Sequence, residues 1–109
     1  MRKSATHSAD ADRASLTKLE QLPNVGPAVA ALLRLAGVHI PQDLAGRDPY
    51  LMFDRLCHLT GTQHDPCLLD TFIAAVRFMD GEPAKPWWAY TAERKRRLDA
   101  DSVVSLRKR

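Results

Sequence analysis

The residues best suited to binding an anion lie in the turn Leu22-Pro23-Asn24-Val25-Gly26-Pro27. Gly26-Pro27 places proline at the first position of a helix, where its missing N–H is not needed. A helix N-terminus offers unpaired backbone N–H groups and a partial positive charge, and a phosphate oxygen suits both. Because Gly26 has no side chain, a phosphate backbone can approach closely. The candidate phosphate-binding residues are Asn24, Val25, Gly26, Ala28 and Val29, with Lys18 and Arg34 as flanking charges.

Side chains that zinc prefers recur in one short stretch, at Cys57, His58, His64 and Cys67. Their spacing fits no familiar zinc finger, and adjacent residues point about 100° apart on a helix, which separates Cys57 from His58. A zinc site made by Cys57, His64 and Cys67 is therefore the less favoured hypothesis. Packed thiols, with no metal and no cofactor, are expected instead.

A redox-sensitive pair of Cys57 and Cys67 is a further hypothesis. Cys67 lies in the first turn of an expected helix, where the helix dipole lowers the pKa of a thiol. The neighbouring Asp65 and Asp70 oppose a thiolate, so this hypothesis is also less favoured than packing.

Aromatic and basic side chains gather towards the C-terminus. Prolines exclude a regular helix from 82–90, so Trp87 and Tyr90 are expected to pack back as a lid with Trp88 partly exposed. The alternative is that Trp87 and Trp88 stack on bases or dock a protein partner.

The net charge of +3 and pI of about 9.1 are modest, so the position of the charges matters more than their sum. The basic run Arg94, Lys95, Arg96 and Arg97 is either a solvated helix face or an accessory arm that follows phosphates.

Five helices are expected in the bundle, and a sixth, short one in the tail. Leu16, Leu19 and Leu22 predict about two turns behind a Ser15 cap, ending before Pro23. Further helices are expected over 27–36, over a short connector at 40–46, over 49–60 and over 66–79, each followed by a glycine stop signal. A last short helix is expected from a Thr91 cap through Leu98. No segment shows the period of a strand, so the fold class is all-α.

The chain of 109 residues is long enough for one core. The expected organisation is a disordered leader over 1–14, a helical domain over 15–91 and a basic tail over 92–109. No membrane span or secretory signal is found, which predicts a cytoplasmic protein. The sequence contains no glycine-rich nucleotide loop and no arrangement typical of a hydrolase, so we expect neither an enzyme nor a small-molecule substrate.

The turn Leu-Pro-x-Val-Gly-Pro-Ala, followed by an Ala- and Leu-rich helix, resembles the helix-hairpin-helix motif of proteins that bind DNA without sequence specificity. The resemblance continues over roughly 16–95, and the chain is similar to the bacterial pathogenicity-locus family of small helix-hairpin-helix proteins. The segments that carry it include Asp43-Leu44-Ala45-Gly46-Arg47-Asp48-Pro49, His64-Asp65-Pro66-Cys67-Leu68-Leu69-Asp70 and Trp87-Trp88-x-Tyr90-Thr91. One departure is Asn24, where the usual hairpin has glycine.

The resemblance implies a compact, SAM-like bundle of two helix-hairpin-helix units joined by the connector helix. The second unit is degenerate, because Asp65 stands where a phosphate would approach. The first functional hypothesis is weak, non-specific DNA binding through phosphates, in DNA repair or processing. The alternative is a protein-interaction module that has lost its DNA site and docks a partner through its helix faces and Trp87-Trp88.

Overall fold

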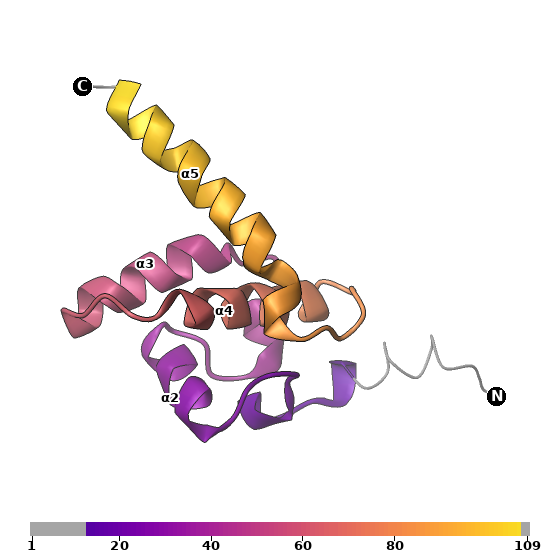
Figure 1. Cartoon of the computed structure of the whole chain (residues 1–109). Coiled ribbons are helices and arrows are strands. Elements are labelled where there is room, and N and C mark those ends of the chain that lie inside the picture. Colours follow the sequence, from indigo (N-terminus) through magenta and orange to yellow (C-terminus); the bar gives the residue numbers. More distant parts are fainter. Residues whose placement is uncertain (1–12, 108–109) are drawn as a thin grey trace.

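The computed structural model describes residues 13–107, and it describes side chains for residues 13–99. Within this range the chain is helical and has no β-strand, so the all-α prediction is confirmed there (Figure 1). The expected leader, apart from its last two residues, and the last two residues of the tail lie outside the described part. The elements are η1 (Leu19–Gln21), α2 (Pro27–Leu35), η2 (Pro41–Leu44), α3 (Pro49–Thr60), α4 (Pro66–Met79), η3 (Trp87–Tyr90) and α5 (Thr91–Arg107), where η denotes a 3-10 helix.

The two Asp-Pro pairs start α3 and α4, as predicted. The carboxylate of Asp48 accepts the N–H of Tyr50 at 2.9 Å, and that of Asp65 accepts the N–H of Cys67 at 2.9 Å. Each bond satisfies one of the donors that a helix leaves unpaired at its start. At the other end of α3, Gly61 adopts the left-handed conformation with φ 65°, which stops the helix.

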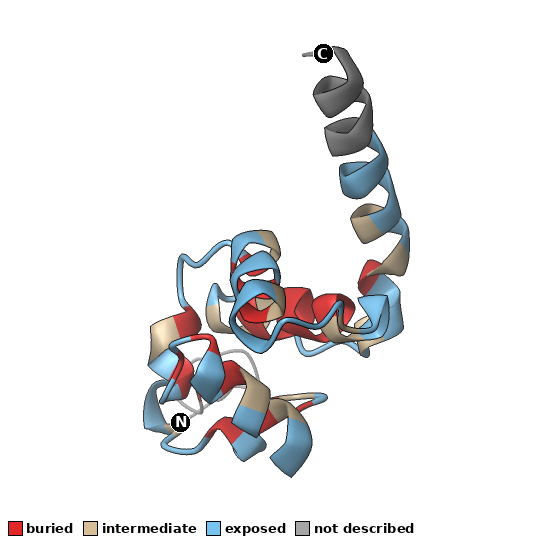
Figure 2. Cartoon of the chain, turned by 90° about the vertical axis from the view of Figure 1, so that its left-hand side faces the viewer, coloured by how far each residue is buried: buried red, intermediate tan, exposed pale blue. Residues whose placement is uncertain are grey.

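The central helix is α4, which lies against α3, η2, η3 and α5. Every residue from Leu69 to Val76 is buried, and Figure 2 shows the buried residues running along this helix. Phe53 of α3 meets Phe72 of α4 edge to face, with ring centroids 6.2 Å apart. α2 packs on α3 and η1 and adds Ala30 and Leu33 to the same core. The helices before and after the connector therefore contribute to one core.

The predicted two-turn helix before Pro23 is wrong. Arg13 to Ser15 are helical, Lys18 is extended with φ −122° and ψ 141°, and only the 3-10 turn η1 follows. The side-chain oxygen of Gln21 accepts the N–H groups of Thr17 and Lys18, both at 2.9 Å, and this fixes the break. The leucines recur at intervals of three, which is the period of a 3-10 helix. Ser15 therefore lies among the helical residues 13–15, and the N-cap of η1 is Lys18.

The prediction of a short last helix is also wrong, because α5 runs from Thr91 to Arg107. Its composition explains the length, since Ala, Leu, Arg and Lys favour helix and the segment has no Gly or Pro. Thr91 is not its cap, because the residue already has helical angles, with φ −59° and ψ −43°. The chain enters α5 directly from η3, and α5 leads away from the body of the molecule (Figure 1).

The connector is η2, and Gly46 beyond it has φ 75°, in agreement with the expected short helix and its glycine stop. Asp43 closes the turn by accepting the N–H groups of His39 at 3.0 Å and Ile40 at 3.3 Å. No helix in the described part of the chain is long and apolar enough to cross a bilayer.

Candidate nucleic-acid interface

The turn before α2 has the form of a type II turn. The N–H of Val25 donates to the carbonyl of Leu22 at 3.2 Å, and Asn24, the third residue, has φ 68°. This turn type favours proline at the second position and requires a positive φ at the third, which asparagine tolerates better than most residues. The departure at Asn24 therefore leaves the turn intact. Because the N–H of Val25 is used within the turn and its side chain is buried, Val25 is not a phosphate donor, contrary to expectation.

The N-terminus of α2 is open. Gly26 is its N-cap, and no heavy atom lies within 4 Å of the place where a Cβ would stand. No side chain caps the helix, and no group in the described part of the chain accepts the N–H of Gly26, Ala28 or Val29. Gly26 and Ala28 are exposed and Val29 is half-buried. Three of the predicted donors therefore lie together at an accessible helix start without an acidic residue in the first turn.

The starts of α3 and α4 differ from this one, because Asp48 and Asp65 already occupy them. At α4 the carboxylate of Asp65 stands where an anion would have to bind, as the sequence indicates. The backbone hydrogen bond from Cys67 keeps the pKa of Asp65 below its ordinary value, so this negative charge is maintained. The start of α4 therefore already carries a negative charge, which accepts the N–H of Cys67.

Asn24 joins the turn to the aromatic segment. Its side-chain amide donates to the carbonyl oxygen of Lys85 at 2.8 Å, 61 residues along the chain. On the other side, the buried Arg13 donates to the carbonyls of Phe78 at 2.6 Å and Glu82 at 2.7 Å. Arg13 belongs to the folded body and not to a leader. Nothing in the sequence connects segment 82–86 to the turn before α2. The structure fixes the two side by side through Asn24 and Lys85.

The aromatic side chains divide as expected for a lid. Tyr90 is buried, Trp87 is half-buried and Trp88 is 63% exposed. The two indoles meet edge to face at 86°, with centroids 5.5 Å apart. The ammonium of Lys85 lies 5.8 Å from the ring of Tyr90. The indole of Trp88 is therefore presented to solvent on a segment that also carries the exposed Lys85.

The two predicted flanking charges have different surroundings. Arg34 is exposed but lies 3.3 Å from the carboxylate of Glu20, so part of its charge is balanced. A backbone hydrogen bond and then Arg34 lower the pKa of Glu20, which keeps the pair ionised. Lys18 is exposed at the start of η1. The charge of Lys18 also lowers the pKa of Glu20, so both predicted cations act on the same carboxylate.

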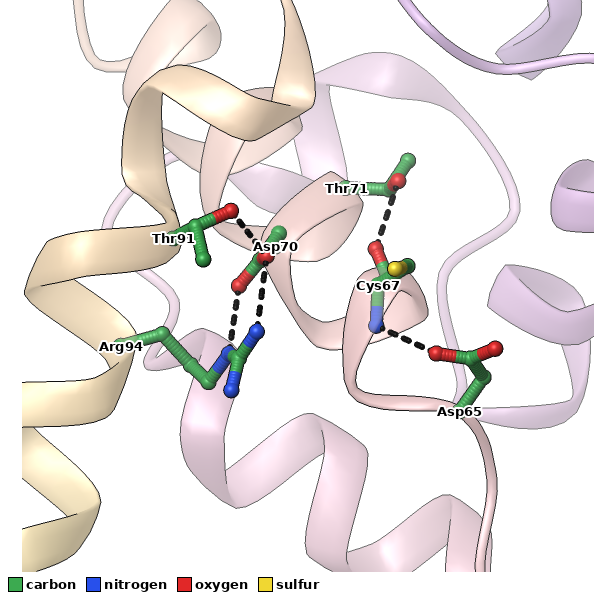
Figure 3. A network of polar contacts seen from close by, with 6 residues as sticks. All are labelled: Asp65, Cys67, Asp70, Thr71, Thr91 and Arg94. Carbon is green, nitrogen blue, oxygen red and sulfur yellow. Dashed lines mark hydrogen bonds and ion pairs between the residues drawn. The ribbon is translucent and has the colours of Figure 1, made fainter.

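The basic run on α5 is not one uniform arm. Figure 3 shows Arg94 turned inward to Asp70, with its Nε 2.9 Å from Oδ1 and its Nη2 3.2 Å from Oδ2, while the hydroxyl of Thr91 donates to Oδ2 at 2.7 Å. The side chain of Arg94 is 12% exposed and that of Asp70 is fully buried. Arg94 therefore anchors α5 and is not available to phosphates. Arg97 lies over the ring of Tyr50 at 4.4 Å, while Lys95 and Arg96 are exposed.

The cysteine and histidine cluster does not assemble into a metal site. In the described part of the chain, no group of three or more metal-binding side chains comes together. His64 Nε2 lies 2.9 Å from the hydroxyl of Thr60. A hydrogen bond to Asp65, then desolvation and the charges of Asp65 and Asp70, raise the pKa of the Cys67 thiol. The direction of this pKa shift agrees with the expected opposition of Asp65 and Asp70 to a thiolate, and Figure 3 shows the carboxylate of Asp65 beside Cys67.

Sequence reasoning missed three residues that organise this region: Arg13, Asp70 and Lys85. Each acts through a partner more than twenty residues away. The only signal in the sequence is an acidic residue on the apolar stripe of α4, at Asp70, because such a residue needs a buried partner.

Comparisons with known proteins identify the family of this chain. Residues 12–96 match the family model described as pathogenicity locus. The mitomycin resistance protein McrB of Streptomyces lavendulae is 45% identical over 80 residues, which cover 73% of this chain and 76% of that protein. No solved structure matches the chain. The chain belongs to the pathogenicity-locus family.

Proposed function

We propose that this protein binds nucleic acid through its phosphate backbone, without reading the base sequence, at the N-terminus of α2. The observation that carries the proposal is the contrast between the three helix starts. Asp48 and Asp65 occupy those of α3 and α4, whereas that of α2 is open at Gly26 with its N–H groups unpaired in the described structure. Unpaired N–H groups and the helix dipole together favour an anion.

In this proposal, η1, the type II turn and α2 form the hairpin of a helix-hairpin-helix unit within a SAM-like bundle. The α3–α4 pair is its degenerate copy, in which Asp65 replaces the anion. Among the exposed cations, Lys18, Lys85, Lys95 and Arg96 would add attraction of longer range. The protein is then a non-enzymatic binding module, and its affinity should fall steeply with salt because counterions are released from the phosphates.

Membership of the family supports the proposal only indirectly. The relative named as a mitomycin resistance protein gives a cellular readout, which is the sensitivity to mitomycin of cells with and without this protein. A role in DNA repair or processing predicts that loss of the protein changes this sensitivity, and that a variant defective in nucleic-acid binding fails to restore it.

The direct test is fluorescence anisotropy with a short labelled DNA duplex at about 50 and 200 mM salt, a range over which phosphate contacts weaken strongly. The variants are Gly26→Glu and the double variant Lys95→Ala/Arg96→Ala. Truncation after Thr91 is unsuitable, because it removes Arg94 and leaves Asp70 buried without its partner. Gly26→Glu should abolish binding, whereas the double variant should weaken it and lower the salt slope by about 1 to 2.

A protein-interaction module is the second candidate. Leu51 and Leu59 lie on α3 and are 57% and 63% exposed, so this helix has an apolar surface that no described residue covers. If the wild type shows no nucleic-acid binding even at low salt, Leu51→Ser and Trp88→Ala should be tested for loss of a captured protein partner.

A further inference from the structure

We infer that the nucleic acid is single-stranded and that Trp88 stacks on one of its bases. This inference rests on the proposed phosphate site and adds a second contact, to a different part of the same ligand. The surroundings of the exposed indole support this contact independently of the helix N-terminus.

Trp88 is held in place and not left on a loose loop. The segment before it is tied at Glu82 by Arg13 and at Lys85 by Asn24, through hydrogen bonds of 2.7 and 2.8 Å. Trp87 supports the indole edge to face, and the next turn is buried at Tyr90. A fixed aromatic ring that is 63% exposed loses little conformational entropy when a second ring stacks on it.

The surroundings of Trp88 suit a base better than an apolar protein surface. None of the other large apolar side chains that are exposed belongs to this segment, and they lie on or beside α2, η2, α3 and α5. Lys85 lies three residues before Trp88 in the chain and is exposed, and its ammonium, 5.8 Å from the ring of Tyr90, carries a positive charge that complements a phosphate. A base and its own phosphate match an exposed indole and an exposed cation that belong to the same short segment.

The two contacts are close enough for one short strand. Asn24 is two residues from Gly26, and its partner Lys85 is three residues from Trp88. At about 3.5 Å of chain per residue, and adding the hydrogen-bonded side chain, the Cα atoms of Gly26 and Trp88 are at most about 25 Å apart. A strand of a few nucleotides spans this distance. A paired base in a duplex keeps its faces stacked on its neighbours, so it cannot meet Trp88 without being unstacked.

The test compares three labelled probes of equal length at low salt: single-stranded oligo-dT, a DNA duplex, and an abasic strand that keeps the phosphates but has no bases. The wild type should bind oligo-dT more tightly than either of the other two. Trp88→Ala should weaken oligo-dT binding about tenfold, the size expected for one stacked base, and leave the abasic strand unchanged. Trp88→Phe should restore most of the loss, because phenylalanine retains a stacking face.

A second readout is the tryptophan fluorescence of a Trp87→Phe variant, in which Trp88 is the remaining indole. Oligo-dT should quench it and the abasic strand should not. Equal affinity for all three probes, or an equal loss on oligo-dT and the abasic strand in Trp88→Ala, would overturn the stacking role while leaving the phosphate site in place. Absence of binding to every probe would overturn both proposals, and Gly26→Glu separates them because it should remove binding to all three.

Discussion

The side-chain amide of Asn24 and the carbonyl of Lys85, 61 residues apart in sequence, are joined by a hydrogen bond of 2.8 Å. This contact connects the turn before α2 to the segment that carries Trp87 and Trp88. It also explains why asparagine suits a position where glycine is usual in the hairpin motif. Asparagine tolerates the positive φ and supplies the amide that holds the second segment.

Substitution of Asn24 should separate these two roles. In Asn24→Gly, the glycine adopts the positive φ without strain but cannot make the hydrogen bond to Lys85. We therefore expect the free energy of unfolding to fall by about 1 kcal/mol. Asn24→Ala adds the cost of a Cβ in the left-handed region, about 1–2 kcal/mol more. Urea denaturation of the two variants and the wild type measures both steps. Equal losses in the two variants would show that the turn conformation contributes nothing.

The buried ion pair of Asp70 and Arg94 predicts a large effect on stability. Arg94→Ala leaves a fully buried carboxylate with Thr91 as its remaining described partner, and should cost about 3–5 kcal/mol in the free energy of unfolding. Lys95→Ala, one residue further and exposed, should change it by no more than about 0.5 kcal/mol. Chemical denaturation monitored by circular dichroism compares them. A similar small effect of both substitutions would contradict an anchoring role for Arg94.

The environment of Cys67 predicts an unreactive thiol. The raised pKa means that less thiolate is present at a given pH, so Cys67 should react more slowly with a thiol reagent at pH 8 than an unperturbed cysteine, although it is exposed. Asp65→Asn retains a helix cap and removes the charge, which should lower the pKa and accelerate the reaction severalfold. Rates are measured on Cys57→Ala proteins to isolate Cys67. An unchanged or slower rate in Asp65→Asn would contradict this explanation.

Local signals in the sequence predict much of this fold. Pro27, Pro49 and Pro66 mark the starts of α2, α3 and α4, and glycines with positive φ follow several helices. These signals work because each depends on the φ and ψ of one or two residues. The prediction of an α-helix over 16–22 failed because leucines spaced by three fit both an α-helix and a 3-10 turn.

The roles of the charged residues were harder to predict than the helices. In the sequence, Arg94 is one of four consecutive basic residues that look alike. Only the packing of α5 on α4 turns it inward to Asp70, while Lys95 and Arg96 remain exposed. The connection of Asn24 to Lys85 likewise depends on the tertiary fold. The exposed N–H groups at the start of α2 were predictable, because they depend on the conformation of one turn. The contact of that turn with Lys85 was not, because it depends on the tertiary fold.

The most direct test of the central claim places at α2 the carboxylate that already caps α3 and α4. Gly26 is extended, with φ −101° and ψ −172°, and has room for a side chain, so Gly26→Asp should fold with equal or slightly greater stability. Gly26→Ala is the matched control, since it adds a Cβ without a charge or a cap.

The measurement is anisotropy of labelled oligo-dT at low salt with Gly26→Asp, Gly26→Ala and the wild type. We predict that Gly26→Asp lowers the affinity at least about tenfold, because its carboxylate takes the N–H groups and repels phosphate, while Gly26→Ala stays within about threefold of the wild type. Unchanged affinity in Gly26→Asp, with the fold intact, would contradict the claim that the N-terminus of α2 is the phosphate site.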